Sequence, residues 1–289
     1  MRAVRIVVVI NQKGGVGKTT TVANLGAAIA SGGCDVCLLD MDPQSHLTLH
    51  VGLEPGASDA SMYDVMTAEA SIASTAVAVA PHLWTVPSVI DLAAAEVELV
   101  STVGREQILR DRLRSQALPF QYVLIDCPPS LGLLTLNALA AADDVLIPLQ
   151  PHFLALQGLG KLLETVSLVR RRINPGLKVC GVVLCMYETG TRLASEVAAD
   201  IRSFFGAAQN TATPWSAAHI FQAVVRRNVK LAECPSHGKT IFDYEPASHG
   251  AEDYRALAEE FLAHVPAQSP PEAAEPDPAQ DPASPEGAG

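Results

Sequence analysis

The chain has 289 residues, of which 48% are hydrophobic and 18% charged, and its formal net charge is −11. This length allows one large α/β domain or two small ones. No apolar run reaches the about 18 residues that suggest a membrane-spanning helix, because Asn137, Asp143 and Asp144 interrupt the strongest candidate. The N-terminus lacks a signal-peptide layout. We therefore expect a cytoplasmic protein without a membrane segment.

Apolar, β-branched runs alternate along the chain with segments of helical periodicity. The predicted strands cover residues 5–10, 35–40, 83–86, 121–126, 144–149, 179–185 and 221–225. The predicted helices cover residues 18–31, 89–100, 105–115, 131–141, 156–173, 192–205 and 251–265. Such alternation predicts a three-layer α/β fold, in which a mostly parallel, twisted sheet carries helices on both faces. We expect one domain over residues 1–265.

Residues 266–289 differ in composition from the rest of the chain, being rich in Pro, Ala, Glu and Ser. They hold five of the 31 acidic residues and none of the 20 basic ones. Residues 1–265 therefore carry a formal net charge of −6. Such a segment buries too little apolar surface to order itself, so a disordered acidic tail is predicted. The basic residues that remain are clustered, and clusters matter more than net charge for binding a nucleic-acid backbone.

A glycine-rich segment joins the first predicted strand to the first predicted helix. Its glycines let backbone N–H groups converge on phosphate oxygens, toward which the helix turns its positive end. In this pattern Lys18 reaches the outer phosphates and Thr19 can bind Mg²⁺. A nucleoside triphosphate with Mg²⁺ is the expected ligand. The predicted nucleotide-binding residues are Lys13, Gly14, Gly15, Val16, Gly17, Lys18, Thr19 and Thr20.

The same segment departs from the ordinary phosphate-binding pattern. Gln12 stands where a glycine is usual, and a second lysine, Lys13, follows it. A second lysine would repel Lys18 in an empty site, so its presence indicates a concentrated negative charge that another subunit could present. A solvated loop lysine is the alternative.

Acidic residues follow two of the predicted strands. Asp40 and Asp42 lie at the end of the strand over 35–40, and Asp126 ends the strand over 121–126. Because ligands of open α/β sheets bind at the carboxyl ends of strands, these acids are expected near Lys18. An acid in the position of Asp126 is typical of the carboxylate that holds a Mg²⁺-bound water. A helix cap or turn is the alternative role.

Together these segments resemble the ParA/MinD class of P-loop ATPases. The deviant loop KGGVGKT at residues 13–19 is the mark of that class, residues 40–44 resemble its second motif, and residues 126–130 resemble its Walker B strand end. Residues 227–239 resemble a segment typical of chromosomal ParA proteins, also called Soj. The resemblance spans residues 4–265.

The resemblance implies an ATPase that forms a homodimer with ATP, and it implies roles for particular residues. Lys13 would reach across the dimer to the partner's phosphates, much as an arginine finger acts in trans. Asp42 corresponds to the acid that positions or activates the attacking water. The implied catalytic residues are Lys13, Lys18 and Asp42, and the implied metal site comprises Thr19, Asp40 and Asp126.

Resemblance to Soj proteins also makes Arg192, Arg227 and Lys230 candidates for sequence-independent contacts with double-stranded DNA. The family's usual proline before Arg227 is replaced here by Arg226, which adds charge and alters the expected loop. A solvated basic face is the alternative. The implied function is chromosome or plasmid segregation on nucleoid DNA, with a ParB-like partner that stimulates hydrolysis.

Three alternative functions follow from the same family. A MinD-like membrane-associated cell-division regulator would need a basic amphipathic C-terminal helix, whereas residues 251–265 are rich in acids. A ParA-type ATPase that positions another cargo would have the same fold and site. A sequence-specific repressor would need an N-terminal helix-turn-helix module, for which the first predicted strand is expected to leave no room.

Overall fold

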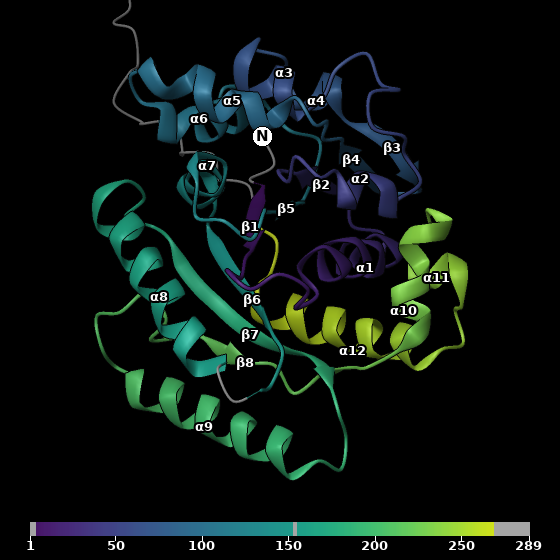
Figure 1. Cartoon of the computed structure of the whole chain (residues 1–289), viewed down its shortest axis with the longest axis vertical. Coiled ribbons are helices and arrows are strands. Elements are labelled where there is room, and N and C mark those ends of the chain that lie inside the picture. The colour runs from purple at the N-terminus through teal and green to yellow at the C-terminus, as the bar shows by residue number, and fades with distance from the viewer. Residues whose placement is uncertain (1–3, 153–154, 269–289) are drawn as a thin grey trace, which may run out of the picture.

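The computed structural model describes residues 4–152 and 155–268, and a twisted sheet forms its centre (Figure 1). Within these ranges the strand order is β3-β4-β2-β5-β1-β6-β7-β8, and β9 pairs with the end of β7. Only β3 and β4 pair antiparallel. The strands are β1 (Arg5–Val9), β2 (Val36–Asp40), β3 (Val77–Ala80), β4 (Leu83–Val86), β5 (Tyr122–Asp126), β6 (Asp144–Leu149), β7 (Lys178–Tyr187), β8 (His219–Ile220) and β9 (Val225–Arg226).

Helices cover both faces of this sheet, as parallel strands require for their crossover connections. The α-helices are α1 (Lys18–Ser31), α2 (His46–His50), α3 (Met62–Thr67), α4 (Ile72–Thr75), α5 (Leu92–Glu98), α6 (Ile108–Arg114), α7 (Leu133–Ala141), α8 (Ala155–Arg172), α9 (Arg192–Ala208), α10 (Val229–Glu233), α11 (Ile241–Tyr244) and α12 (His249–His264). Single 3₁₀ turns are η1 (Leu99–Ser101), η2 (Arg105–Gln107) and η3 (Cys234–His237). The predicted three-layer α/β fold is confirmed.

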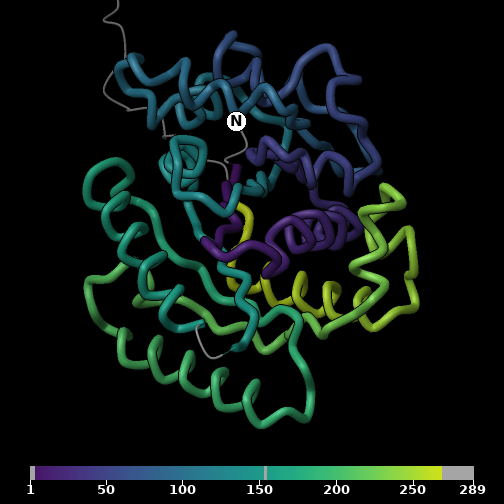
Figure 2. The backbone as a smooth tube through the Cα atoms, in the orientation of Figure 1, coloured from purple at the N-terminus to yellow at the C-terminus, as the bar shows by residue number. Residues whose placement is uncertain are grey.

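The side chains of β1 show how the two layers of core arise. Val7 and Val9 are buried in the core that α1 and α12 cover, while Ile6 and Val8 are buried in the core that α7 and α8 cover. A strand buried on both faces reads as a continuous apolar run, as this one does. Figure 2 shows α1 (purple) and α12 (yellow) side by side although they are far apart in the sequence. The hydroxyls of Thr21 and Tyr254 join the two helices at 3.2 Å.

Most predicted elements occur near their expected positions, but the predicted strand over 221–225 is wrong. Instead β8 ends at Ile220, directly before it, and β9 begins at Val225, its last residue, so residues 221–224 form no strand. The cause is Glu260 of α12, whose carboxylate accepts the backbone N–H groups of Gln222 and Ala223 at 2.8 and 2.9 Å. These two groups are therefore not available to a strand ladder. The predicted tail lies outside the described residues from Ser269 onward.

Several short elements were not predicted from the sequence. Strand β3 has only four residues, alternately half-buried and exposed, and two of them are alanines, which rarely favour strands. Helices α2, α3, α4, α10 and α11 have four to six residues each, too few to show a clear helical period. Three of them begin at a residue whose side chain caps the helix, as in the Ser61–Asp64 capping box of α3, whereas α2 and α11 have no side-chain cap.

Candidate nucleotide-binding site

The loop between β1 and α1 adopts a conformation that glycine makes accessible. Gly15 has φ of 71° and Gly17 has φ of 93°, in the left-handed region where a side chain would be strained. Helix α1 begins directly after Gly17, and its first turn carries no acidic residue. The positive end of the helix dipole is thus uncompensated within the helix, as an anion-binding site requires.

Lys18 lies inside this loop with only 7% of its surface exposed. Its ammonium donates to the backbone oxygen of Lys13 at 3.3 Å. Burial lowers the pKa of the Lys18 ammonium, while the carboxylates of Asp126 and Asp42 act in the opposite direction. A buried cation with one backbone acceptor is well suited to a phosphate oxygen, because the phosphate would supply the charge that burial has removed from water.

Thr19 and Asp126 form the second part of the site. The Thr19 hydroxyl donates to Oδ2 of Asp126 at 2.6 Å. Asp126 is completely buried, and burial raises its pKa to about 8, with the neighbouring charge of Asp40 adding to the effect. Its Oδ1 has no hydrogen-bond partner among the described residues. An unpaired buried carboxylate oxygen beside a hydroxyl fits a hard cation such as Mg²⁺, which takes oxygen ligands and retains bound waters.

Asp40 and Asp42 lie at the end of β2, as expected, but their surroundings differ. Both oxygens of Asp40 are occupied: Oδ1 accepts the N–H of Asp42 at 3.1 Å, and Oδ2 accepts the N–H and hydroxyl of Thr48 at 2.8 and 2.7 Å. Burial raises the pKa of Asp40 to about 6. Asp40 therefore fastens α2 to the sheet, and its role at the metal stays a prediction. Asp42 uses Oδ1 to accept the N–H of Gln44 at 3.0 Å.

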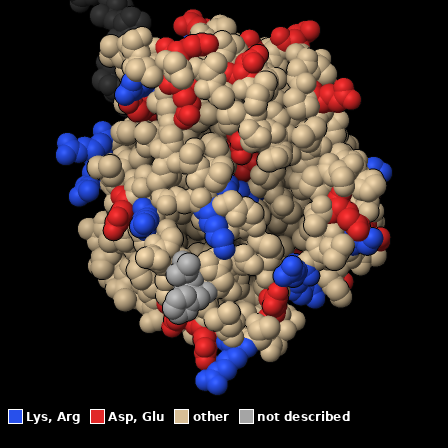
Figure 3. Space-filling model, in the orientation of Figure 1, with Lys and Arg blue, Asp and Glu red and all other residues tan. Residues whose placement is uncertain are grey.

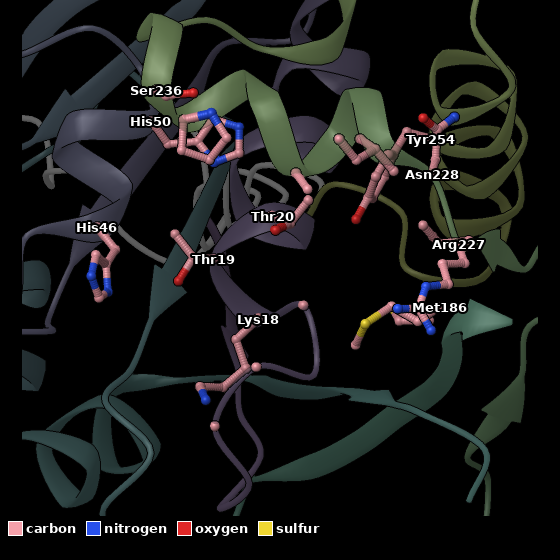
Figure 4. Close-up of a pocket in the computed structure, with 18 of the residues that line it drawn as sticks. Lys18, Thr19, Thr20, His46, His50, Met186, Arg227, Asn228, Ser236 and Tyr254 are labelled. Carbon is pink, nitrogen blue, oxygen red and sulfur yellow. The ribbon is translucent and has the colours of Figure 1, made fainter.

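Lys18, Thr19 and Asp42 line a cavity of about 900 Å³, large enough for a nucleotide, whereas Asp40 and Asp126 are absent from the described residues that line it. Figure 4 shows Lys18 and Thr19 at its centre, His46 and His50 on one side and Met186 and Arg227 on the other. Several lining residues lie in segments that resemble family motifs but were not themselves predicted to bind a ligand: Gln44, Pro129, Asn228, Val229, Leu231, Ala232, Pro235 and Ser236. The others had no signal in the sequence, because they lie in short or distant elements that only the fold brings together: His46, Leu49, His50, Cys185, Met186, Val225 and Tyr254.

The exposure and the contacts of Lys13 differ from those of Lys18. It is exposed, and it is absent from the described residues that line the cavity. Its backbone N–H donates to Oδ1 of Asn11 at 3.0 Å, and its Nζ lies 2.7 Å from Nε2 of His152. Its predicted action on a partner's nucleotide stays a prediction.

The three candidates for DNA contact are exposed, and each is paired with one glutamate. The pairs are Arg192–Glu196 at 2.7 Å, Arg227–Glu188 at 3.1 Å and Lys230–Glu233 at 3.0 Å. Arg192 is 91% exposed, Arg227 72% and Lys230 44%. Exposed pairs of this kind contribute about 0–1 kcal/mol, so a phosphate could replace the carboxylate at little cost.

Arg226 is held quite differently. Its guanidinium pairs with Asp253 of α12 at 2.5 Å and with Glu252 at 3.3 Å, and its backbone N–H donates to Asp253 at 2.9 Å. The added charge is thus neutralised, and the loop is fastened to α12. Asp253 is nearly buried, and nothing in the sequence separates it from the other acids of α12.

Charge is unevenly distributed over the surface. The sequence has no Lys or Arg between Lys18 and Arg105, although ten acids lie there. Figure 3 shows acidic side chains gathered over the upper part of the molecule and basic ones in the central hollow, with both signs mixed over the lower half and the edges. In the described part of the chain, no helix is long and apolar enough to cross a membrane.

Comparison with known proteins places this site in a family. A family model described as an AAA domain matches residues 4–179. The chromosome partitioning protein ParA of Myxococcus xanthus is 43% identical over 270 residues, covering 92% of this chain and 90% of the relative. The sporulation initiation inhibitor protein Soj of Bacillus subtilis is 42% identical over 261 residues, and the match covers 90% of this chain and 99% of the relative. The chain belongs to the ParA/Soj family of ATPases.

A solved structure shares this fold and contains an ATP analogue with magnesium. Cobyrinic acid a,c-diamide synthase from Mycobacterium smegmatis, with a bound ATP analogue and magnesium, is 35% identical. Its TM-score is 0.75, and the match covers 90% of this chain and 95% of that protein. The predicted ParA/Soj family, ATPase class and cofactors, ATP and Mg²⁺, are confirmed. The individual roles of the predicted site residues remain predictions.

Proposed function

We propose that this ParA/Soj-family chain is a Mg·ATP-dependent ATPase that dimerises with ATP, binds double-stranded DNA without sequence preference, and segregates chromosomes or plasmids with a ParB-like partner. The observation that carries the nucleotide part is the buried contact of Thr19 with Asp126, whose second oxygen lacks a partner. Buried polar groups are normally paired, so this oxygen indicates a missing ligand.

The same arrangement suggests how hydrolysis proceeds. Lys18 and the N–H groups at the start of α1 would bind the outer phosphates, and Thr19 and Asp126 would hold Mg²⁺ and its waters. Mg²⁺ would neutralise charge on the phosphates. Asp42, at the edge of the cavity, would accept a hydrogen bond from the attacking water and orient it. The Asp40–Thr48 contacts fix the segment that carries Asp42, so this carboxylate keeps its place relative to Lys18.

Dimerisation is supported by the contrast between the two lysines of the phosphate loop. Lys18 is buried against its own loop, whereas Lys13 extends from the molecule outside its own cavity. A cation placed there supports action on the nucleotide of a second subunit, where it would offset charge that develops on the phosphates.

DNA binding is supported by Arg192, Arg227 and Lys230, whose exposed charges have weak partners. A symmetric dimer would present each of them twice, and summed phosphate contacts strengthen binding without reading sequence. Arg227 also lines the nucleotide cavity, which would couple its position to the bound nucleotide.

A MinD-like function is less well supported. Asp253 and Glu260 of α12 are used within the fold, by Arg226 and by the 222–223 backbone, and the apolar face of α12 packs against α1. A membrane-binding helix would need that face free. A ParA-type ATPase that positions another cargo, including one at a different cellular site, has the same geometry. In the proposed function the protein is cytoplasmic and associated with the nucleoid.

One experiment tests the proposal as a whole. Full-length protein is sedimented with nonspecific duplex DNA and, separately, with anionic liposomes, each with ATP, ADP or no nucleotide. We expect sedimentation with DNA in ATP only. Sedimentation with liposomes alone would support the MinD-like function, and sedimentation with neither would contradict the proposed DNA binding.

A further inference from the structure

Two contacts tie the start of the phosphate loop to the segment that follows β6. Nδ2 of Asn11 donates to the backbone oxygen of Pro148 at 2.7 Å, and Nζ of Lys13 lies 2.7 Å from Nε2 of His152. The side chain of Asn11 also accepts the N–H of Lys13. The direction of the Lys13 side chain in the single subunit is therefore set by its own subunit, at the backbone and at the ammonium.

The contact between Lys13 and His152 depends on whether Nε2 of His152 is protonated. An ammonium can only donate, so the ring nitrogen that faces it must be unprotonated. Partial burial and the charge of Lys13 lower the pKa of His152 below its ordinary 6.5. The ring is consequently a neutral acceptor at pH 7.5, and protonation in acid would replace the hydrogen bond by repulsion between two cations.

We propose that His152 is a positioning residue that holds Lys13 on its own subunit until the nucleotide of an ATP-bound partner displaces it. The inference rests on the proposed action of Lys13 across the dimer. An exposed lysine held by one uncharged acceptor is held weakly, and a triphosphate with Mg²⁺ competes with that acceptor by charge. Because the contact exists only before assembly, it stabilises the single subunit and raises the ATP concentration that dimerisation requires.

Two substitutions of His152 separate this role from a structural one. His152→Ala removes the acceptor, whereas His152→Gln places an amide oxygen near the position of Nε2 and does not titrate. The matched control is His82→Asn, remote in sequence: His82 pairs through Nδ1 with Asp35 and has a positive φ that asparagine tolerates. Dimerisation of the full-length proteins is measured by light scattering during an ATP titration, with ADP affinity measured in parallel.

At pH 7.5 His152→Ala should lower the ATP concentration for half-maximal dimerisation about two- to fivefold, the range of one weak hydrogen bond. ADP affinity should not change, and His152→Gln and the control should match the wild type. As the pH falls through the pKa of His152, the wild type should approach the alanine variant, while His152→Gln shows no such approach. A higher ATP requirement in His152→Ala, or a glutamine variant that behaves like alanine, would overturn the proposal.

A second measurement does not depend on dimerisation. The His152 ring is titrated by NMR without nucleotide in the wild type and in Lys13→Ala. Loss of the lysine should raise the pKa of His152 toward 6.5, and an unchanged pKa would overturn the role of His152 alone. A wild-type chain that binds ATP yet stays monomeric would instead overturn the proposed function, and the role of His152 with it.

Discussion

At the centre of the site Lys18, Thr19 and Asp126 contact groups of their own chain in buried or half-buried surroundings, whereas at its rim Lys13, which lies outside the cavity, and Arg227 extend exposed side chains to single partners. Among the central groups, Oδ1 of Asp126 has no hydrogen-bond partner in the described part of the chain. The groups at the rim have partners that an incoming charge can replace.

Substitutions at the centre and at the rim should therefore affect different properties of the protein. A buried charge without its partner is expensive, so changes at the centre should act on nucleotide binding directly. An exposed pair contributes little, so changes at the rim should leave nucleotide binding intact and act on assembly or on DNA. Substitutions in each of the two groups of residues test this separation.

Lys18→Ala should abolish measurable ATP binding and turnover. It removes the buried cation that faces the outer phosphates, and truncating one partner of such a pair costs about 2–5 kcal/mol. Isothermal titration with ATP and circular dichroism together separate lost binding from lost folding. ATP affinity close to that of the wild type would contradict the assignment of the loop.

Lys13→Ala should retain ATP binding but lose dimerisation and most hydrolysis. A cation supplied in trans is worth about 10³–10⁵ in turnover, because it acts on charge that develops in the transition state. The measurements are ATP affinity, mass by light scattering and phosphate release. A variant that dimerises at the same protein concentration as the wild type would place Lys13 outside the interface.

Asp42→Ala should bind ATP and hydrolyse it about 100-fold more slowly, within the range for loss of a general base. An ATP-bound dimer should then accumulate, because assembly precedes the missing step. Size-exclusion chromatography with ATP reports the dimer. Unchanged turnover with a monomeric peak would give Asp42 another role.

Changing both Arg227 and Lys230 to Glu should lower DNA affinity about 30-fold or more, equally for all sequences, and flatten its dependence on salt. ATP binding and dimerisation should survive, because Arg227, although it lines the cavity, is exposed and pairs with Glu188 instead of the phosphate loop, and Lys230 is absent from the described residues that line the cavity. The matched control changes Arg171 and Arg172, exposed at the end of α8, to Glu. If the control weakens binding and the test pair does not, DNA is held at α8 instead.

The residues at the centre of the site could be predicted from the sequence more fully than the contacts at its rim, for a physical reason. Lys18, Thr19 and Asp126 each lie directly at the end of a long strand or the start of a long helix, so the periodicity that predicts the element also places the residue. His152, Glu188 and Asp253 lie up to 139 residues from the groups they contact. No local sequence pattern predicts such partners, because only the fold brings them together.

Contacts between distant segments also explain why the strand over 221–225 was predicted wrongly. Residues 221–225 have the apolar, β-branched character of a strand, and the sequence reasoning assigned one. The carboxylate of Glu260 occupies the N–H groups that the strand would need, a contact between segments about 38 residues apart. Long elements with many buried side chains, such as α1 and β5, were predicted because no single distant contact decides them.

The smallest predicted effect concerns the charge at the centre itself. Burial raises the pKa of Asp126 to about 8 in the folded chain, whereas the unfolded chain has the ordinary value of 3.8. Between these values the folded state binds the extra proton, so stability without ligands should fall as pH rises from about 4 to about 8. Asp126→Asn removes this titration. From pH 5.5 to 8.5 the free energy of unfolding should therefore fall about 1–3 kcal/mol less in the variant than in the wild type. Urea unfolding at several pH values, without nucleotide or Mg²⁺, measures this difference. Parallel curves for the two proteins would mean that Asp126 is already ionised in the folded chain, and that the cation site is formed before any ligand binds.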